Sequence, residues 1–356
     1  MSKALLTFQK ISSGLSCLLT SLRPHPLHVQ WFITSQCNYR CRCCGVWRYS
    51  PTRELNLEGI KRGLEILKEF KVATLVFTGG NPLLHRDMGA ILKYARDKFP
   101  VVSIYDNGSL AWKRIEELKQ ADMVCISLHT LKPELQDFLT GIPGSFRAVL
   151  RSVKALRKAR VNVAVDVTIS QLNLEELPHI INFFGSQGIA VIPSLYVEFS
   201  PQNSLIKIGY SEEKAHLKNK KHFIRSLETL KQLKHLYPVH LNDESLEAIK
   251  RFFSKSQRDW KCKALSSFFV IDPMGRVSGC HLMPPVTNLE KLSTFWRSKI
   301  AKKFRARFST CEGCLFLCYL VYSLLDGPRK LASYALAYEL YRLRRILYKS
   351  KHLLKS

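Results

Sequence analysis

The sequence predicts an α/β fold: a (β/α)6 partial TIM barrel, then a small cysteine-rich extension of a hairpin and helices, then a basic amphipathic C-terminal helix. Six short segments rich in β-branched and aromatic residues alternate with segments of helical period between residues 28 and 197. Parallel strands need crossover connections, so this alternation indicates a parallel sheet. Cysteines are clustered directly after the first strand and again near the C-terminus, which predicts two candidate functional sites in the fold.

Composition supports a folded chain. Of 356 residues, 46% are hydrophobic and 23% are charged, which argues against disorder, and the net charge is +27. The length excludes a small disulfide-stapled fold and suits one large domain with an appendage. Bunched cysteines cannot all form relaxed disulfides, so we interpret them as metal ligands in a reducing compartment. No secretory signal is evident, and the apolar run 315–325 is too short to span a bilayer. We therefore expect a cytoplasmic protein, with a peripheral place on the inner face of the membrane as an option.

The expected strands share β-branched and aromatic residues. They cover residues 28–34, 73–78, 101–105, 123–128, 161–169 and 189–197. The helices between them repeat apolar residues every three or four positions, as Ile60, Leu64 and Leu67 do. They cover residues 57–70, 88–98, 111–119, 146–159 and 174–187. In such barrels the loops after the strands' C-terminal ends carry the chemistry.

Beyond residue 200 the alternation stops. Helical patterns cover residues 212–236, 243–253, 292–308 and 330–354. Pro273, Met274 and Gly275 lie between two short strand patterns, 266–272 and 276–278, and predict a hairpin. We divide the chain into an N-terminal amphipathic segment 1–27, a barrel core 28–200, a helical linker 201–260, a cysteine-rich domain 261–325 and a basic tail 326–356.

The first cysteine group follows the first strand. Cys37, Cys41 and Cys44 have the spacing C-x3-C-x2-C. Three thiolates on one loop can hold three irons of a cubane cluster and leave the fourth iron open, as a catalytic site requires. The alternative is a zinc site, with Cys43 as the fourth ligand.

The cysteine loop and four later motifs together resemble the radical S-adenosylmethionine (SAM) superfamily, over about residues 28–325. Each motif follows an expected strand, in the family's order: the cysteine triad, Gly79-Gly80-Asn81-Pro82 (similar to Gly-Gly-Glu-Pro), Asp106-Asn107-Gly108 (similar to Thr-Asn-Gly), Ser127-Leu128-His129 (similar to Ser-Leu-Asp) and residues 141–146.

The resemblance implies that SAM chelates the open iron through its amino and carboxylate groups. One electron then breaks the sulfonium bond, and a 5′-deoxyadenosyl radical abstracts hydrogen from a substrate. It also implies that Gly79, Gly80, Asn81, Asn107 and Ser127 contact SAM. Cys43, Asn81 and Thr140 depart from the family pattern, which keeps open a protein with a degraded SAM site that serves as an iron–sulfur scaffold or electron carrier.

A second cysteine group lies near the C-terminus, at Cys262, Cys280, Cys311, Cys314 and Cys318. It resembles the SPASM or twitch extension of radical SAM enzymes and implies one auxiliary 4Fe–4S cluster. Cys262, Cys280, Cys311 and Cys314 are the expected ligands, and Cys318 competes for one place. A purely structural metal clip is the alternative.

The last 66 residues are strongly basic, since residues 291–356 contain 15 Lys and Arg against 3 Asp and Glu. In the helical pattern 330–354, leucines form one stripe opposite basic residues, which is typical either of a helix on anionic lipid or of one packed on its own protein. No RNA-binding signature is evident, so we do not expect a nucleic-acid partner.

These observations predict a radical SAM oxidoreductase or modifying enzyme that acts on a peptide, a lipid or a lipid-linked substrate. Its expected electron donor is of the ferredoxin or flavodoxin class. Titratable groups near strand ends, at His129, Asp166 and Tyr196, are candidates for substrate or proton contacts.

Overall fold

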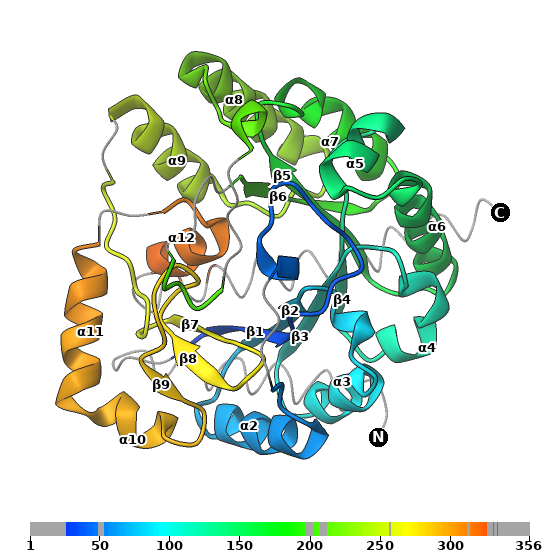
Figure 1. Ribbon diagram of the computed structural model, residues 1–356. Helices are drawn as coiled ribbons and strands as arrows, with labels where there is room; N and C mark the ends of the chain where they lie inside the picture. The colour runs from blue at the N-terminus through cyan, green and yellow to red at the C-terminus, as the bar shows by residue number, and fades with distance from the viewer. Residues whose placement is uncertain are drawn as a thin grey trace.

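The computed structural model describes residues 26–48, 53–196, 202–206, 212–255, 258–311, 314–325, 330 and 333. The expected N-terminal amphipathic segment and the basic C-terminal helix lie almost entirely outside these residues. In the described part, a twisted sheet forms the centre and helices cover its outer side (Figure 1). No helix of the described residues combines the length and apolar character that crossing a bilayer demands.

The sheet is the predicted partial barrel. Its first six strands are parallel and run in the order β6-β5-β4-β3-β2-β1. They are β1 (His28–Thr34), β2 (Thr74–Gly79), β3 (Val101–Asp106), β4 (Met123–Ser127), β5 (Val163–Ile169) and β6 (Ala190–Leu195). β6 is an edge strand among the described residues, so the sheet stays open.

The crossover helices follow the predicted amphipathic patterns. They are α2 (Leu57–Glu69), α3 (Met88–Arg96), α4 (Ile115–Leu118), α5 (Pro133–Thr140), α6 (Ser145–Lys158) and α7 (Leu177–Gly185). Ile60, Leu64 and Leu67 of α2 are buried, as their spacing predicts.

Three expected helices are interrupted, and two helices, α5 and α12 (Leu317–Leu324), were not predicted. The pattern 212–236 begins with a 3₁₀ turn (Glu213–Ala215), and its helix α8 (Lys220–Leu236) starts only at Lys220. In place of a helix over 111–119 there is a 3₁₀ turn (Ala111–Lys113) and then α4, because Arg114 leaves the helical region and its guanidinium binds the carbonyls of Leu83 and His85. The pattern 292–308 divides at Ser298, which has an extended backbone and whose hydroxyl accepts from the Ala301 N–H to cap the following helix. The unpredicted helix α5 has Pro133 in its first turn and ends at Gly141.

The hairpin near the C-terminus extends the barrel sheet. β7 (Phe268–Ile271) and β8 (Arg276–Ser278) form the predicted hairpin, with Gly275 at φ +79° in its turn. β7 pairs in parallel with β1, and β9 (Thr287–Asn288) completes the edge. The cysteine-rich region is therefore joined to the first strand by main-chain hydrogen bonds.

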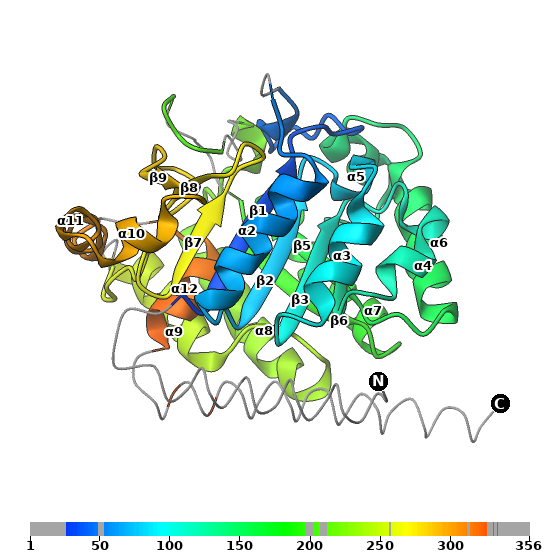
Figure 2. The ribbon, with the colours of Figure 1, turned by 90° about the horizontal axis from the view of Figure 1, so that it is seen from below.

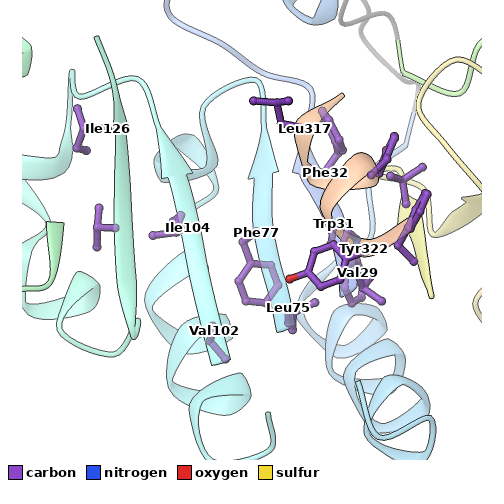
Figure 3. Packing of buried hydrophobic residues seen from close by; sticks show 14 of the residues in the cluster. Val29, Trp31, Phe32, Leu75, Phe77, Val102, Ile104, Ile126, Leu317 and Tyr322 are labelled. Carbon is purple, nitrogen blue, oxygen red and sulfur yellow. The ribbon is translucent and has the colours of Figure 1, made fainter. Parts of the chain in front are cut away.

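The remaining helices lie beyond the barrel strands. They are α8 (Lys220–Leu236), α9 (Asp243–Lys255), α10 (Leu292–Arg297), α11 (Lys299–Ser309) and α12 (Leu317–Leu324). α12 is apolar and fills the open side of the barrel, because it contacts β6 while Tyr319 and Tyr322 stack on Phe268 of β7 and His28 of β1. Figure 1 shows α12 in orange between these strands, and Figure 3 shows it packed against buried side chains of β1.

The imidazole of His28 is buried at the start of β1. Its ring stacks on Tyr322 at 4.4 Å, and neither ring nitrogen has a hydrogen-bond partner. Burial lowers the pKa of His28 to about 3. The unfolded chain therefore binds a proton that the folded chain rejects between about pH 6.5 and 3, so stability falls as the pH falls through that window.

We expect His28→Phe to raise the free energy of unfolding by about 1–3 kcal/mol at pH 7, because it removes an unsatisfied buried N–H. At pH 5 the increase in the free energy of unfolding should be about 2 kcal/mol larger than at pH 7. The wild-type protein takes up a proton at His28 when it unfolds, whereas the variant has no histidine there to take one up. Urea unfolding at both pH values measures this difference. His235→Phe, at an exposed position of α8, is the control, and equal gains at the two pH values would contradict the prediction.

Candidate functional site

One cavity of about 310 Å³ opens at the C-terminal ends of the strands. Residues from β1 to β6 and from the loop after β1 line it. In Figure 2 this loop is dark blue and lies above the strands. The site thus occupies the edge of the sheet where parallel barrels place their chemistry.

Four thiols of the loop, those of Cys37, Cys41, Cys43 and Cys44, line the cavity. The backbone N–H groups of Tyr39 and Val46 donate to the sulfurs of Cys37 and Cys44, each at 3.4 Å. Burial raises the pKa of Cys43 to about 11 and that of Cys44 to about 12. Such thiols stay protonated until a metal binds them, since metal ligation is what stabilises a buried thiolate.

The cysteine loop is attached to the end of α5. The N–H groups of Arg40 and Arg42 donate to the carbonyls of Thr140 and Leu139 at 3.0 and 2.9 Å. The Arg42 guanidinium also lies over the Phe138 ring, 4.1 Å from its centre. The unpredicted helix α5 therefore holds the cysteine loop in place.

Gly141 is the point of closest approach between α5 and the loop. It has φ +68°, and a Cβ there would lie 2.7 Å from the Arg40 carbonyl oxygen. Gly144 has a similar φ of +81°, but its nearest neighbour would be 3.9 Å away. Both glycines have a positive φ, but only at Gly141 would a Cβ contact the cysteine loop.

If the site cleaves SAM, as the sequence resemblance implies, we expect Gly141→Ala to lower that cleavage about 10- to 100-fold relative to Gly144→Ala, because it displaces the thiols. Both variants carry a similar cost for an L-residue at positive φ. Iron content and 5′-deoxyadenosine formation by the two variants measure the difference. If both variants lose the same activity, then backbone strain and not loop displacement is responsible.

Gly79 and Gly80 line the cavity, and the structure shows a steric reason for both glycines. A Cβ at Gly79 would lie 2.2 Å from the Thr34 carbonyl oxygen, and one at Gly80 would lie 2.2 Å from that of Gln36. The N–H groups of Gly80 and Asn81 donate to these same carbonyls at 2.9 and 2.7 Å. The glycine pair thus joins the end of β2 to the residues that lead into Cys37.

Asn81 is fully buried and supports this loop from behind the cavity wall. Its Oδ1 accepts from the Leu83 N–H at 2.9 Å, and its Nδ2 donates to the side-chain oxygens of Asn38 and Asn107, each at 3.0 Å. A carboxylate at this position would have no hydrogen to donate. Asn81 therefore orients Asn107, whose Nδ2 lies 3.9 Å from the Cys37 sulfur.

Other polar groups at the strand ends face the cavity. Ser127 at the end of β4 and Asp106 at the end of β3 both line it. Asp106 Oδ1 accepts from the Gly108 N–H at 2.7 Å, while Oδ2 is buried without a partner. Burial raises the pKa of Asp106 to about 7. This carboxyl group is suited to receive a hydrogen bond from a ligand.

His129, Asp166 and Tyr196 all line the same cavity. The Thr168 N–H donates to His129 Nδ1 at 3.2 Å, and burial lowers the pKa of this histidine to about 4. Asp166 accepts from the Ser194 hydroxyl at 2.7 Å, and burial raises its pKa to about 6. The Tyr196 hydroxyl accepts from the Glu212 N–H at 2.7 Å. At pH 7 His129 is thus a neutral imidazole, and the pKa of the Asp166 carboxyl group lies close to neutral pH.

The second group of thiols lies around the start of α12. Burial and the nearby thiols of Cys314, Cys262 and Cys311 raise the pKa of Cys280. Among the described residues, no three His, Cys, Asp or Glu side chains are close enough to share one metal ion. A zinc site needs its thiolates about 2.3 Å from a single point. In neither group does the described part of the chain gather three thiols around such a point.

Several residues of the site carry no motif and were not predicted. Glu54 Oε1 accepts from the N–H and hydroxyl of Ser35 at 2.9 and 3.1 Å, and so holds the chain just before Cys37. His281, Tyr105 and Gln30 line the cavity from three different strands or loops. Of the cavity residues that were not predicted, only Asp106 could have been found from the sequence, because it directly precedes Asn107 at a strand end.

Comparison with known proteins shows what the chain is similar to. The model of the radical SAM superfamily matches residues 31–184. The chain is 27% identical over 267 residues to the antilisterial bacteriocin subtilosin biosynthesis protein AlbA of Bacillus subtilis (strain 168), which covers 73% of this chain and 56% of that protein. It is 31% identical over 157 residues to the AdoMet-dependent heme synthase of Methanosarcina barkeri, which covers 43% of this chain and 45% of that protein. The chain thus spans about half the length of these curated relatives.

Two solved structures share the fold. Streptococcus suis SuiB bound to S-adenosylmethionine superposes with a TM-score of 0.64 at 16% identity, over 90% of this chain and 79% of that one. The enzyme anSMEcpe with bound AdoMet and the Cp18Cys peptide superposes with a TM-score of 0.58 at 14% identity, over 92% of this chain and 99% of that one. At these identities the likeness concerns the fold.

Proposed function

Residues 31–184 form a radical SAM domain, and from this premise we propose that the protein is an enzyme that uses a 4Fe–4S cluster and SAM to abstract hydrogen from a peptide substrate. The observation that carries the proposal is the position of Cys37, Cys41 and Cys44 on the wall of one strand-end cavity. A 310 Å³ cavity lies at the lower end of the range for small-molecule sites.

The residues present fit both groups. The loop offers Cys37, Cys41 and Cys44 on one cavity wall, and the sulfurs of Cys37 and Cys44 already accept backbone hydrogen bonds. The unpartnered Asp106 Oδ2 can accept from a hydroxyl or ammonium group of a ligand. Asn107 and Ser127 add polar contacts on the same wall. When bound, the cluster and SAM would supply one-electron cleavage of the sulfonium and the hydrogen abstraction.

The chain's own residues would orient and protect these groups. Cys37, Cys41 and Cys44 would hold the cluster, and the α5 contacts with Arg40 and Arg42 would fix the loop. Val46 and Trp47 line the cavity beside the thiols and would limit the entry of water. In the second group, Cys262, Cys280, Cys311 and Cys314 would hold one auxiliary 4Fe–4S cluster. A one-electron donor of the ferredoxin or flavodoxin class would supply the electron.

A peptide is the substrate class best supported. The relative AlbA is named for the biosynthesis of subtilosin, a bacteriocin, and SuiB has been crystallised with a precursor peptide. The hypothesis of a lipid or lipid-linked substrate depends on the basic segments 1–27 and 326–356. These segments lie almost wholly outside the described residues.

Two measurements test the proposal. Anaerobically reconstituted protein, reduced with dithionite and mixed with SAM, should form 5′-deoxyadenosine. Short precursor-like peptides encoded beside the gene should then raise the rate, whereas vesicles of anionic phospholipid should not. Persistent absence of 5′-deoxyadenosine with both clusters loaded would instead favour the scaffold or electron carrier. Modification of vesicle lipid without any peptide effect would favour the lipid substrate.

A further inference from the structure

Cys314 and Cys318 lie four residues apart but face different surroundings. Cys314 precedes α12, and its pKa is raised to about 12 by burial and by the nearby thiols of Cys262 and Cys311. Cys318 lies in the first turn of α12, the helix that fills the open side of the barrel. Cys314 therefore lies among the thiols of the second group, whereas Cys318, although it lies near Cys314, also lines the barrel cavity.

Cys318 lines the strand-end cavity together with Cys37, Cys41 and Cys44. None of the other four cysteines of the second group lines it. The Gln30 side chain, from β1, is hydrogen-bonded to the Cys318 sulfur. Tyr105, at β3, lines the same cavity. Cys318 is thus a thiol on the wall of the strand-end cavity.

A second observation points to a ligand at this place. His281 lines the cavity, is only 3% exposed, and its Nε2 has no hydrogen-bond partner. Its other nitrogen, Nδ1, lies 2.8 Å from the Tyr319 hydroxyl, which holds the ring. A buried polar atom without a partner is costly, so a polar group of a bound molecule is the natural partner for Nε2.

We propose that Cys318 is not a cluster ligand but a catalytic thiol that donates its hydrogen atom to the carbon radical of the bound substrate, while His281 Nε2 binds a polar group of that substrate. The proposal rests on the proposed function. The S–H bond breaks homolytically, a C–H bond forms, and the unpaired electron passes to the Cys318 sulfur. An S–H bond is weaker than most aliphatic C–H bonds, so the transfer is downhill. One proton from solvent and one electron from the same ferredoxin- or flavodoxin-class donor restore the thiol.

The first test needs no substrate. In D2O the thiol carries exchangeable deuterium, so wild-type protein with SAM and dithionite should release 5′-deoxyadenosine that contains deuterium. Cys318→Ser keeps a similar shape and a hydrogen-bonding group for Gln30, but its O–H bond is too strong to donate. We expect this variant to incorporate at least fivefold less deuterium. Cys125→Ser is the matched control, because Cys125 is a buried thiol on β4 that does not line the cavity.

The second test is independent of activity. Iron analysis and electron paramagnetic resonance of the reconstituted protein should show both clusters in Cys318→Ser and loss of the auxiliary cluster in Cys314→Ser.

Either of two results would overturn the proposal: loss of auxiliary iron in Cys318→Ser, or unchanged deuterium content in that variant. If wild-type protein forms no 5′-deoxyadenosine at all, the proposed function fails. If it forms unlabelled product with both clusters intact, only the role of Cys318 fails.

Discussion

Replacing Cys41 by alanine should remove the iron of the first cluster and lower SAM cleavage more than about 100-fold, because even residues behind a metal ligand are worth 10- to 100-fold. Cys41 lines the cavity together with Cys37 and Cys44 and is the middle cysteine of the C-x3-C-x2-C spacing. Iron and acid-labile sulfide per chain, together with 5′-deoxyadenosine formation, measure the loss.

Cys43→Ala is the matched control for this experiment. Cys43 is a half-buried residue of the same loop, and burial of its thiol together with the nearby Asp166 carboxylate raises its pKa. We expect this variant to keep its iron and most of its activity, because three thiols and SAM complete the cluster. Equal loss of iron in both variants would mean that all four thiols bind metal. The site would then be a closed centre with four protein ligands and no open position for SAM.

Gly80→Ala should abolish SAM cleavage even though it adds only one methyl group. The new Cβ would lie 2.2 Å from the Gln36 carbonyl oxygen and 2.6 Å from that of Ser35. Both contacts are with backbone, which cannot turn away as a side chain can. Overpacking of this kind costs about 1–3 kcal/mol or more, and it separates β2 from the residues that enter the cysteine loop. We expect a loss of activity above about 100-fold, because small displacements of catalytic groups have effects of that size.

Gly89→Ala is the control for Gly80→Ala. At Gly89, within α3, the nearest atoms to a new Cβ belong to the Glu117 side chain, which can move. Circular dichroism melts separate a folding defect from a local one. We expect a folded Gly80→Ala protein with reduced iron. Full iron content and normal SAM cleavage in this variant would contradict the close approach seen between Gly80 and Gln36.

Much of the fold follows from local patterns. Six strand patterns, the helical period of residues 57–70 and the turn at Gly275 each depend on neighbours within a few positions, and all appear in the structure near their predicted bounds. Local patterns failed where a distant contact decides the conformation. Arg114 breaks a helix because it reaches the carbonyls of Leu83 and His85, and this demand is invisible in residues 111–119.

The candidate site could likewise be predicted from the sequence only in part. The spacing of Cys37, Cys41 and Cys44 and the strand-end positions of Gly79, Asn107 and Ser127 were sufficient to predict one shared edge of the sheet, and these residues do line one cavity. Asn81 belongs to the same motif but lies behind the wall, because its amide is used entirely by backbone and side-chain partners.

What the sequence by itself determined is therefore the order of strands and helices, the thiol-rich loop after β1 and the likeness to radical SAM enzymes. Only the tertiary structure decided that β7 pairs with β1, that α12 fills the open side of the barrel and that Cys318 faces the same cavity as Cys37. The reason is physical. Periodicity reports which face of an element is apolar, whereas the partner of that face depends on packing between segments about 290 residues apart, such as Gln30 and Cys318.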